Sequence, residues 1–214
     1  ENIIALMTPI LKSFSTDVGF WSANNALQIY GGHGYVADHG MEQFVRDSRI
    51  APIYEGTNGI QALDLIGRKM KYDNGDIVDG FFMILNSFLK DIKSNKELKF
   101  EVSLFEQSYE DLKSVIKYLK SLDNNNLNEI NGPAVEFLEM FSYIAIGYAW
   151  LKMLKISTEN QKKLSNDFLE TKISTGKYYF NKILPKTSYL KENILVGASN
   201  YNDYKDNYFE SGFN

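Results

Sequence analysis

The chain has 214 residues, of which 44% are hydrophobic and 23% are charged, a balance typical of a globular protein with a sizeable core. Its net charge of -4 leaves no excess of Lys and Arg, which argues against a nucleic-acid surface or a polybasic membrane patch. The absence of cysteine excludes disulfides, thiolate catalysis and Cys-based zinc sites.

The two histidines, His33 and His39, are not spaced to place two ligands on adjacent turns of one helix face, so no metal site is expected. No apolar run approaches the ~18 residues that a membrane-spanning helix needs, and the N-terminus does not resemble a signal peptide. We therefore expect an intracellular, cytoplasmic protein without membrane insertion. Because the chain opens with Glu1 and is already amphipathic by Ile4, we also expect it to be part of a longer protein.

The first predicted helix covers residues 3–30, where apolar side chains recur at helical spacing and form one broad buried stripe. Gly31-Gly32 is expected to end this helix, because glycine accepts the positive φ of a C-cap at no steric cost. A loop to about Gly40 is expected to follow.

A short helix is predicted over residues 41–48, and Pro52 is expected to stop it by favouring an extended conformation in the residue before it. Another helix is predicted from about Thr57 to Met70. The polar cluster at residues 71–76 contains an Asn-Gly pair and is expected to form the main boundary of the chain.

Beyond this boundary the apolar residues again recur at helical spacing, and strand patterning is nearly absent. Helices of this length joined by short polar links favour an antiparallel bundle, since each must bury its stripe against a neighbour. The fold class is therefore expected to be all-α. The four predicted helices cover residues 77–92, 105–122, 134–155 and 159–184, the last ending before Pro185.

The last thirty residues differ in their residue pattern, because aromatic residues lie among Asn, Asp, Lys and Ser without a helical period. We expect a tail that wraps its own bundle through these aromatic anchors, or one that docks onto a missing partner domain. The aromatic residues are Tyr189, Tyr201, Tyr204, Tyr208, Phe209 and Phe213.

A glycine cluster, Gly31-Gly32-x-Gly34, follows the first helix. Such a cluster exposes consecutive backbone N–H groups without side-chain obstruction, a geometry suited to anionic oxygens such as those of a pyrophosphate. Judged alone, it is more often just a helix stop and turn. It is not a Rossmann fingerprint, because no strand precedes it and the GxGxxG spacing is missing.

Glu55 lies between Tyr54 and Gly56, just before a helix that Thr57 can cap through its hydroxyl. The aromatic ring on one side and the bare backbone on the other let a ligand approach and shed water. Partial desolvation would raise the pKa of the carboxyl and make it a usable general base. The alternative, favoured by the local sequence alone, is a carboxylate that stabilises the helix N-terminus by roughly a few tenths of a kcal/mol.

Arg46, Asp47 and Arg49 lie upstream of this carboxylate. An Arg-Asp pair could fix the loop that carries Glu55 through a charge-assisted hydrogen bond, or it could be a surface ion pair worth almost nothing. Structural support is the favoured interpretation over catalysis.

These motifs, taken in order, resemble the C-terminal segment of the acyl-CoA dehydrogenase family. The resemblance covers roughly residues 5 to 70, and the combination is highly specific. It is carried by Gln28-Ile29-Tyr30-Gly31-Gly32-His33-Gly34-Tyr35, by Arg46-Asp47-x-Arg49-Ile50 and by Ile53-Tyr54-Glu55-Gly56-Thr57-x-x-Ile60-Gln61.

The resemblance implies an FAD enzyme of fatty acid metabolism that oxidises an acyl-CoA thioester to a trans-2-enoyl-CoA. In this family one residue removes the α proton while the β hydride passes to flavin N5. Glu55 looks like that base, and Tyr54 and Gly56 look like residues that shape the thioester pocket.

The resemblance also assigns cofactor contacts. Gln28, Gly31 and Gly32 look like the segment that contacts the FAD of a neighbouring subunit, and Thr57 looks like a contact to the FAD of its own subunit. A site built from two subunits implies a homodimer or homotetramer. Electrons would leave through an electron-transfer flavoprotein.

The sequence departs from the commonest family pattern in two ways. Gly59 stands where many members carry a Gln near the flavin, and the chain continues for about 140 residues beyond the last family helix. The extension resembles a longer branch that includes methylthiopropionyl-CoA dehydrogenase-like enzymes. Residues 1–74 are thus expected to be the end of the C-terminal helical domain, and residues 75–214 an additional helical bundle.

The acyl and flavin pockets of the family are built largely by an N-terminal helical domain and a middle β domain. We therefore expect this chain in isolation to be inactive and to bind FAD poorly. The alternatives are a non-catalytic helical module for interaction or oligomerisation, and an acyl-CoA oxidase-like enzyme.

Overall fold

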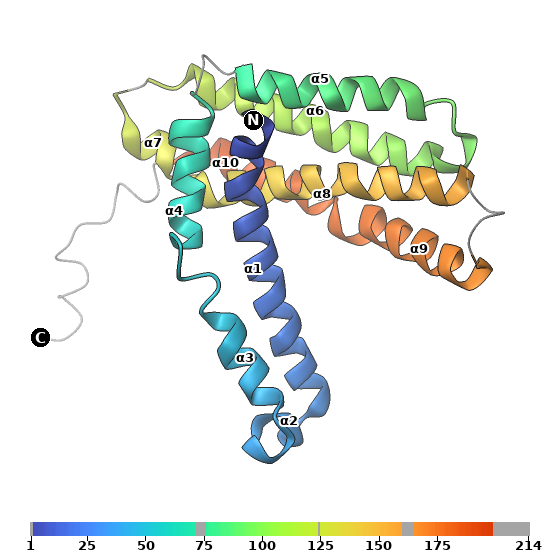
Figure 1. Ribbon diagram of the computed structural model, residues 1–214. Helices are drawn as coiled ribbons and strands as arrows, with labels where there is room; N and C mark the ends of the chain where they lie inside the picture. Colours follow the sequence, from blue (N-terminus) through green and yellow to red (C-terminus); the bar gives the residue numbers. More distant parts are fainter. Residues whose placement is uncertain (1, 72–75, 124, 160–164, 199–214) are drawn as a thin grey trace, which may run out of the picture.

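The computed structural model describes residues 2–71, 76–123, 125–159 and 165–198. Within these ranges all regular structure is helical and no strand occurs. The predicted all-α fold class is therefore confirmed. The helices fall into two parts, a stack of long helices and a helical hairpin that projects from it (Figure 1).

The first helix, α1 (Asn2–Tyr30), is present as predicted, and Gly31 ends it with a φ of +59°. The predicted loop up to Gly40 is wrong in part, because it contains two short helices, α2 (Gly32–Tyr35) and η1 (Ala37–His39). One-turn helices carry no periodic signal that a sequence pattern can detect.

The next helices also follow the predictions closely. α3 (Met41–Arg49) ends shortly before Pro52, and Thr57 caps α4 (Asn58–Leu63) by accepting a hydrogen bond from Ile60 N over 3.3 Å. The predicted helix up to Met70 continues from α4 as η2 (Asp64–Lys69), which is wound as a π-helix.

The four long helices predicted after the boundary are present and run alternately in opposite directions (Figure 1). Aromatic rings interlock them: Phe81 stacks on Phe141, and Phe82 meets Tyr109 edge to face. The long helices are α5 (Asp76–Ile92), α6 (Lys99–Ser121), α8 (Ala134–Glu159) and α9 (Asn166–Tyr178). Two shorter helices connect them: η4 (Lys96–Leu98) precedes α6, and α7 (Leu127–Asn131) precedes α8. A third, η5 (Tyr179–Ile183), follows α9 directly.

The helix after Pro185 is a correction to the predicted tail. Lys186–Val196 forms α10, although this segment had no evident helical period, and Tyr189 is 68% exposed instead of anchoring it. Thr187, Leu190 and Ile194 are the buried residues of α10, a sparse stripe of one residue every three or four positions. The other aromatic residues of the predicted tail lie outside the described residues.

The fourth predicted helix also differs in its bounds, since Glu159 is the last residue of α8 and the described part of α9 begins at Asn166. Residues 160–164 lie outside the described residues, and so do residues 72–75 of the predicted boundary.

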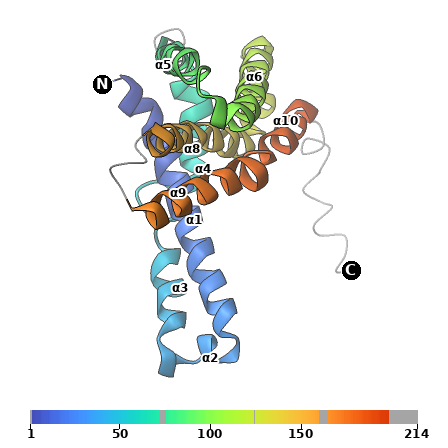
Figure 2. The same cartoon turned by 90° about the vertical axis from the view of Figure 1, so that its right-hand side faces the viewer.

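α1 belongs to both parts of the fold. Its first half buries Leu6 and Ile10 in the same core as α5 and α8. Its second half, with α2 and α3, projects away from the long helices in both views (Figures 1 and 2). We call residues 18–49 the arm. It presents exposed apolar side chains, among them Trp21 at 65% and Ile29 at 85%.

α1 and the stretch that contains α8 each pass the length and composition test for a membrane span, which corrects the expectation that no such segment exists. The window that includes α8 is 61% buried inside the protein, as a core helix is. The N-terminal half of α1 packs in the same core.

Candidate functional site

The loop between α3 and α4 carries Glu55 in an unusual backbone conformation. Glu55 has a φ of +56°, and no other non-glycine residue of the described chain has a positive φ. Gly56 follows with a φ of +82°. Holding a side-chain-bearing residue in this region costs roughly 1–3 kcal/mol, and such residues cluster at functional sites.

Hydrogen bonds from three sides hold the loop in this shape. Gln61 Nε2 donates to Glu55 O over 3.1 Å, and the N–H of Asn58 donates to Pro52 O over 3.1 Å. Lys12, which lies on α1 44 residues before Gly56, donates from Nζ to Gly56 O over 2.9 Å. The loop is thus tied to its own helix and to a helix that is distant in sequence.

Asn58 is the centre of a second set of hydrogen bonds to α1. Its Oδ1 accepts from Lys12 Nζ over 2.8 Å, and its Nδ2 donates to Asp17 Oδ1 over 2.7 Å and to Thr16 Oγ1 over 3.0 Å. Nδ2 also lies 3.3 Å from the backbone oxygen of Ser13. The amide is therefore oriented by partners on both of its polar atoms.

Sequence reasoning missed Lys12 and Asn58. A usable signal was present on α1, because Lys12 and Thr16, and likewise Ser13 and Asp17, are pairs of polar residues four positions apart in a mostly apolar helix. Such pairs lie on one helix face, and an apolar helix with a polar stripe predicts a polar partner packed against that stripe. Which residue packs against the stripe is set by the tertiary structure and cannot be read from the local sequence.

Of the two alternatives for Arg46 and Asp47, the pair that would fix the loop is not formed, and Arg46 instead makes a surface ion pair within α3. Arg46 Nε donates to Glu42 Oε2 over 2.6 Å, one helical turn earlier in α3, and the Arg46 side chain is 70% exposed. The guanidinium of Arg49 lies over the ring of Phe20 at 5.6 Å. These residues stabilise the arm and do not reach the loop.

The desolvated surroundings expected for Glu55 are not built by the described residues alone. Glu55 and Gly56 are exposed, and Tyr54 is 50% exposed. The backbone conformation of the loop is therefore set within this chain, whereas one side of the carboxylate is open to solvent.

The glycine cluster lies at the tip of the arm, where Gln28, Gly31 and Gly32 are exposed. A Cβ added to Gly31 or Gly32 would meet nothing within 4 Å, so no described atom crowds this face. The predicted run of free amides is corrected, because Gly31 N–H donates to Gln28 O and Gly34 N–H to Gly31 O, both over 3.0 Å.

The structure does not bring the glycine cluster and Glu55 together. The cluster precedes α3 and the loop that carries Glu55 follows it, so α2 and this loop lie at opposite ends of α3 (Figure 1). A helix of nine residues is roughly 13 Å long. Thr57, by contrast, lies only two residues after Glu55. Among the described residues no group of three or more His, Cys, Asp or Glu side chains is placed to hold a metal ion.

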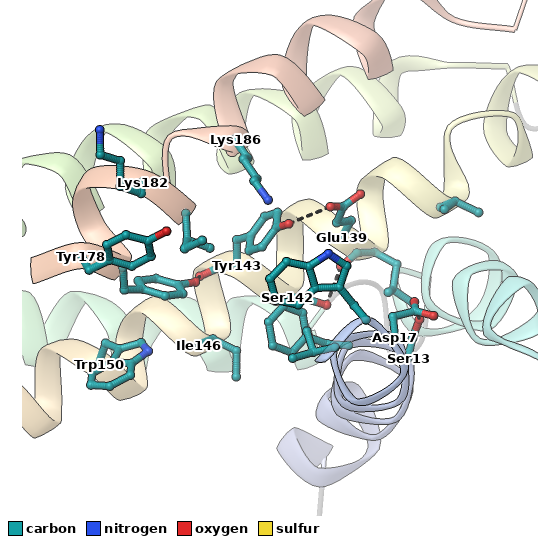
Figure 3. Close-up of a pocket in the computed structure, with 17 residues that line it drawn as sticks. Ser13, Asp17, Glu139, Ser142, Tyr143, Ile146, Trp150, Tyr178, Lys182 and Lys186 are labelled. Atoms are coloured by element: carbon teal, nitrogen blue, oxygen red, sulfur yellow. Dashed lines mark hydrogen bonds between the residues drawn. The ribbon is translucent and has the colours of Figure 1, made fainter. Parts of the chain in front are cut away.

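A groove of about 750 Å³ lies between α1 and the helices α8, α9 and α10 (Figure 3). In it Tyr143 Oη donates to Glu139 Oε1 over 2.8 Å, and burial, followed by that hydrogen bond, raises the pKa of Tyr143 above its usual range. Ser13 and Asp17 line this groove and also contact Asn58. The groove and the Glu55 loop are therefore joined through a single turn of α1.

Two family models match this chain. The model described as "Acyl-CoA dehydrogenase, C-terminal domain" matches residues 5–71, and the one described as "Acetyl-CoA dehydrogenase C-terminal like" matches residues 81–204. The chain belongs to the acyl-CoA dehydrogenase family. The resemblance seen in the motifs is thereby confirmed. The division of the chain into residues 1–74 and 75–214 stays a prediction.

Relatives from this acyl-CoA dehydrogenase family align over most of the chain. It is 28% identical to the 3-methylmercaptopropionyl-CoA dehydrogenase of Ruegeria pomeroyi, with 88% of this chain and 32% of that protein covered. It is 25% identical to a broad-specificity linear acyl-CoA dehydrogenase of Mycobacterium tuberculosis, with 88% of this chain and 33% of that protein covered. The chain thus spans about a third of the length of the curated relatives it matches.

The fold is also that of a solved acyl-CoA dehydrogenase. A crystal structure of the Bacillus anthracis enzyme complexed with FAD superposes with a TM-score of 0.69 at 19% identity, covering 89% of this chain and 32% of that one. This likeness shows that the arm and the long helices together form a fold that acyl-CoA dehydrogenases adopt.

Proposed function

We propose that the whole protein is an FAD-dependent acyl-CoA dehydrogenase and that Glu55 is its general base. The observation that carries the proposal is the backbone of Glu55, held at a φ of +56° by hydrogen bonds from Gln61 and Lys12 to its loop. A protein that only needed a turn here would be more stable with glycine at this position, since glycine adopts positive φ without strain.

In this proposal the carboxylate of Glu55 takes the α proton of an acyl-CoA thioester, so that the proton ends on a carboxylate oxygen. FAD, when bound, supplies the acceptor for the hydride that leaves the β carbon, which makes the product a trans-2-enoyl-CoA. Tyr54 and Gly56 border the thioester. Gly56 keeps that side of the loop free of atoms, and a Cβ there would already lie 3.0 Å from Gln61 Nε2.

The cofactor contacts are proposed for residues at the two ends of α3. Thr57 Oγ1 accepts from Ile60 N, which leaves its hydroxyl hydrogen free to donate to the FAD of its own subunit. Gln28, Gly31 and Gly32 at the tip of the arm contact the FAD of a neighbouring subunit. Because these contacts are assigned to the cofactors of two subunits, the protein is proposed to be a homodimer or homotetramer.

The exposed apolar side chains of the arm support this assembly, because surfaces of this kind mark contacts with other protein parts. Electrons are proposed to leave through an electron-transfer flavoprotein. The chain by itself is proposed to be inactive, since Glu55 and the tip of the arm are exposed and the rest of both sites must come from elsewhere.

Glu55→Gln in the full-length protein tests the function. Gln keeps the size of the side chain but accepts no proton, so turnover of acyl-CoA with an artificial electron acceptor is expected to fall at least about 10²-fold. Bound FAD, read from the flavin absorbance, is expected to stay unchanged. Glu170→Gln, on the exposed surface of α9, is the matched control, and wild-type turnover by Glu55→Gln would refute the assignment.

A further inference from the structure

The loop that carries Glu55 needs a restraint from outside itself, because a residue with a side chain relaxes readily to negative φ. The bond from Gln61 to Glu55 O comes from the same short segment of chain. The bonds from Lys12 come from α1, 44 and 46 residues away in sequence. Lys12 therefore ties the loop to α1, together with the bonds that Asn58 makes to Thr16 and Asp17.

Lys12 spans the end of the loop and the start of α4. Its ammonium has three donors, of which one goes to Gly56 O over 2.9 Å and one to Asn58 Oδ1 over 2.8 Å. These two acceptors flank Thr57 on either side. Because the donor is charged, both bonds are stronger than those between neutral groups.

Asn58 in turn fixes the end point of the lysine. Its Nδ2 donates to Asp17 Oδ1 and Thr16 Oγ1, so its Oδ1 is turned towards Lys12. An aspartate at this position would keep the acceptor for the lysine, lose the donors and face the carboxylate of Asp17. Lys12 and Asn58 thus form a two-residue latch between α1 and the loop.

We propose that this latch positions the carboxylate of Glu55 for proton abstraction, with Lys12 and Asn58 as positioning residues that do not touch the substrate. The proposal rests on the proposed function of Glu55. Release of the latch lets the backbone at Glu55 relax towards negative φ. This change swings the Glu55 side chain away from the α carbon of the bound acyl-CoA. Misplacing a catalytic group by about 1 Å can cost a factor of 10² in rate.

The test uses the full-length enzyme with Lys12→Met, Asn58→Asp and the control Lys177→Met, an exposed lysine of α9. Met keeps most of the length of the lysine side chain and removes both donated bonds. The two latch variants are expected to lower kcat roughly 10- to 100-fold while KM and FAD content stay near wild type. The isotope effect of an α-deuterated acyl-CoA on kcat is expected to rise, because proton abstraction becomes the slow step.

Glu55→Gln, measured in parallel, separates this inference from the function on which it depends. If Glu55→Gln is inactive and the latch variants keep wild-type kcat and isotope effect, the latch is refuted and the function stands. Full activity of Glu55→Gln overturns both. Loss of FAD or of folded protein in both latch variants also overturns the proposal, since it shows that these residues hold the fold and not the carboxylate.

Discussion

The ring of Phe14 meets the ring of Tyr143 edge to face, with their centroids 5.9 Å apart. This contact joins α1 to α8, and Phe14 follows Lys12 by only two residues. The long helices after residue 76 thus support the helix that holds the Glu55 loop. A supporting role for this part of the chain needs no direct contact with a substrate.

Phe14→Ala is expected to loosen this support. Phe14 is half-buried and packs against the core, so truncation is expected to cost about 2 kcal/mol, less than a fully buried phenylalanine would. The measurement is amide hydrogen exchange in residues 2–30, which is expected to become faster in the variant. Exchange that speeds up equally in α6 would instead indicate global destabilisation.

Gly34→Ala is expected to damage the tip of the arm. A Cβ at Gly34 would lie 2.5 Å from the backbone oxygen of Leu27, which cannot move without displacing α1, so a loss of about 1–3 kcal/mol in the free energy of unfolding is expected. Gly80→Ala on α5 is the control. A Cβ there meets nothing within 4 Å, and stability is expected to stay level or rise by about 0.5–1 kcal/mol.

Alkaline pH is expected to destabilise the protein through Tyr109. This side chain is 2% exposed, and burial raises its pKa from 10.0 to about 12. Between these two values the unfolded chain releases the phenolic proton and the folded chain keeps it, so the free energy of unfolding falls as pH rises, by at most about 1.4 kcal/mol per pH unit. Urea unfolding between pH 9 and 12, compared with Tyr109→Phe, measures this contribution, and identical pH profiles would contradict it.

α10 is expected to depend on one ion pair. Lys191 Nζ lies 2.8 Å from Asp111 Oδ1, and the Asp111 side chain is 8% exposed. Lys191→Met leaves this carboxylate nearly buried without its cation, so the free energy of unfolding is expected to fall by about 1–3 kcal/mol. Lys191→Met combined with Asp111→Asn is expected to recover part of the loss. Chemical denaturation of the single and double variants gives the coupling between the two residues.

The isolated 214-residue chain is expected to bind FAD weakly or not at all. Its proposed contacts lie at opposite ends of α3 and are exposed, so no single cofactor is enclosed by them. Titration of the chain followed by flavin fluorescence tests this expectation against the full-length protein as the positive control. Tight stoichiometric binding by the chain would show that the missing parts are not needed.

The long helices were predictable because periodic apolar residues determine which face is buried, and Gly31 and Thr57 act through local geometry that the sequence specifies. The pairing of Arg46 with Glu42 was also accessible, since residues four apart on a helix are neighbours. α10 was missed because only Thr187, Leu190 and Ile194 are buried on it.

The hydrogen bonds between Lys12 and the Glu55 loop were beyond such reasoning. They join residues 44 and 46 positions apart, and no local pattern specifies which polar groups meet across that distance. The left-handed backbone of Glu55 was equally hidden, because a glutamate gives no sequence signal for positive φ. Sequence singled out Glu55 as the candidate base, and tertiary structure showed how its loop is restrained.

α1 is a single unbroken helix whose first turns lie in the core and whose last turn carries Gln28. Each residue of an α-helix advances the chain by about 1.5 Å along the helix axis and turns it by roughly 100° about that axis. Inserting or deleting one residue between Phe14 and Gln28 would therefore rotate the tip by more than a quarter turn relative to Lys12. The helix is thus expected to tolerate side-chain changes on its exposed face but no insertion or deletion of a residue.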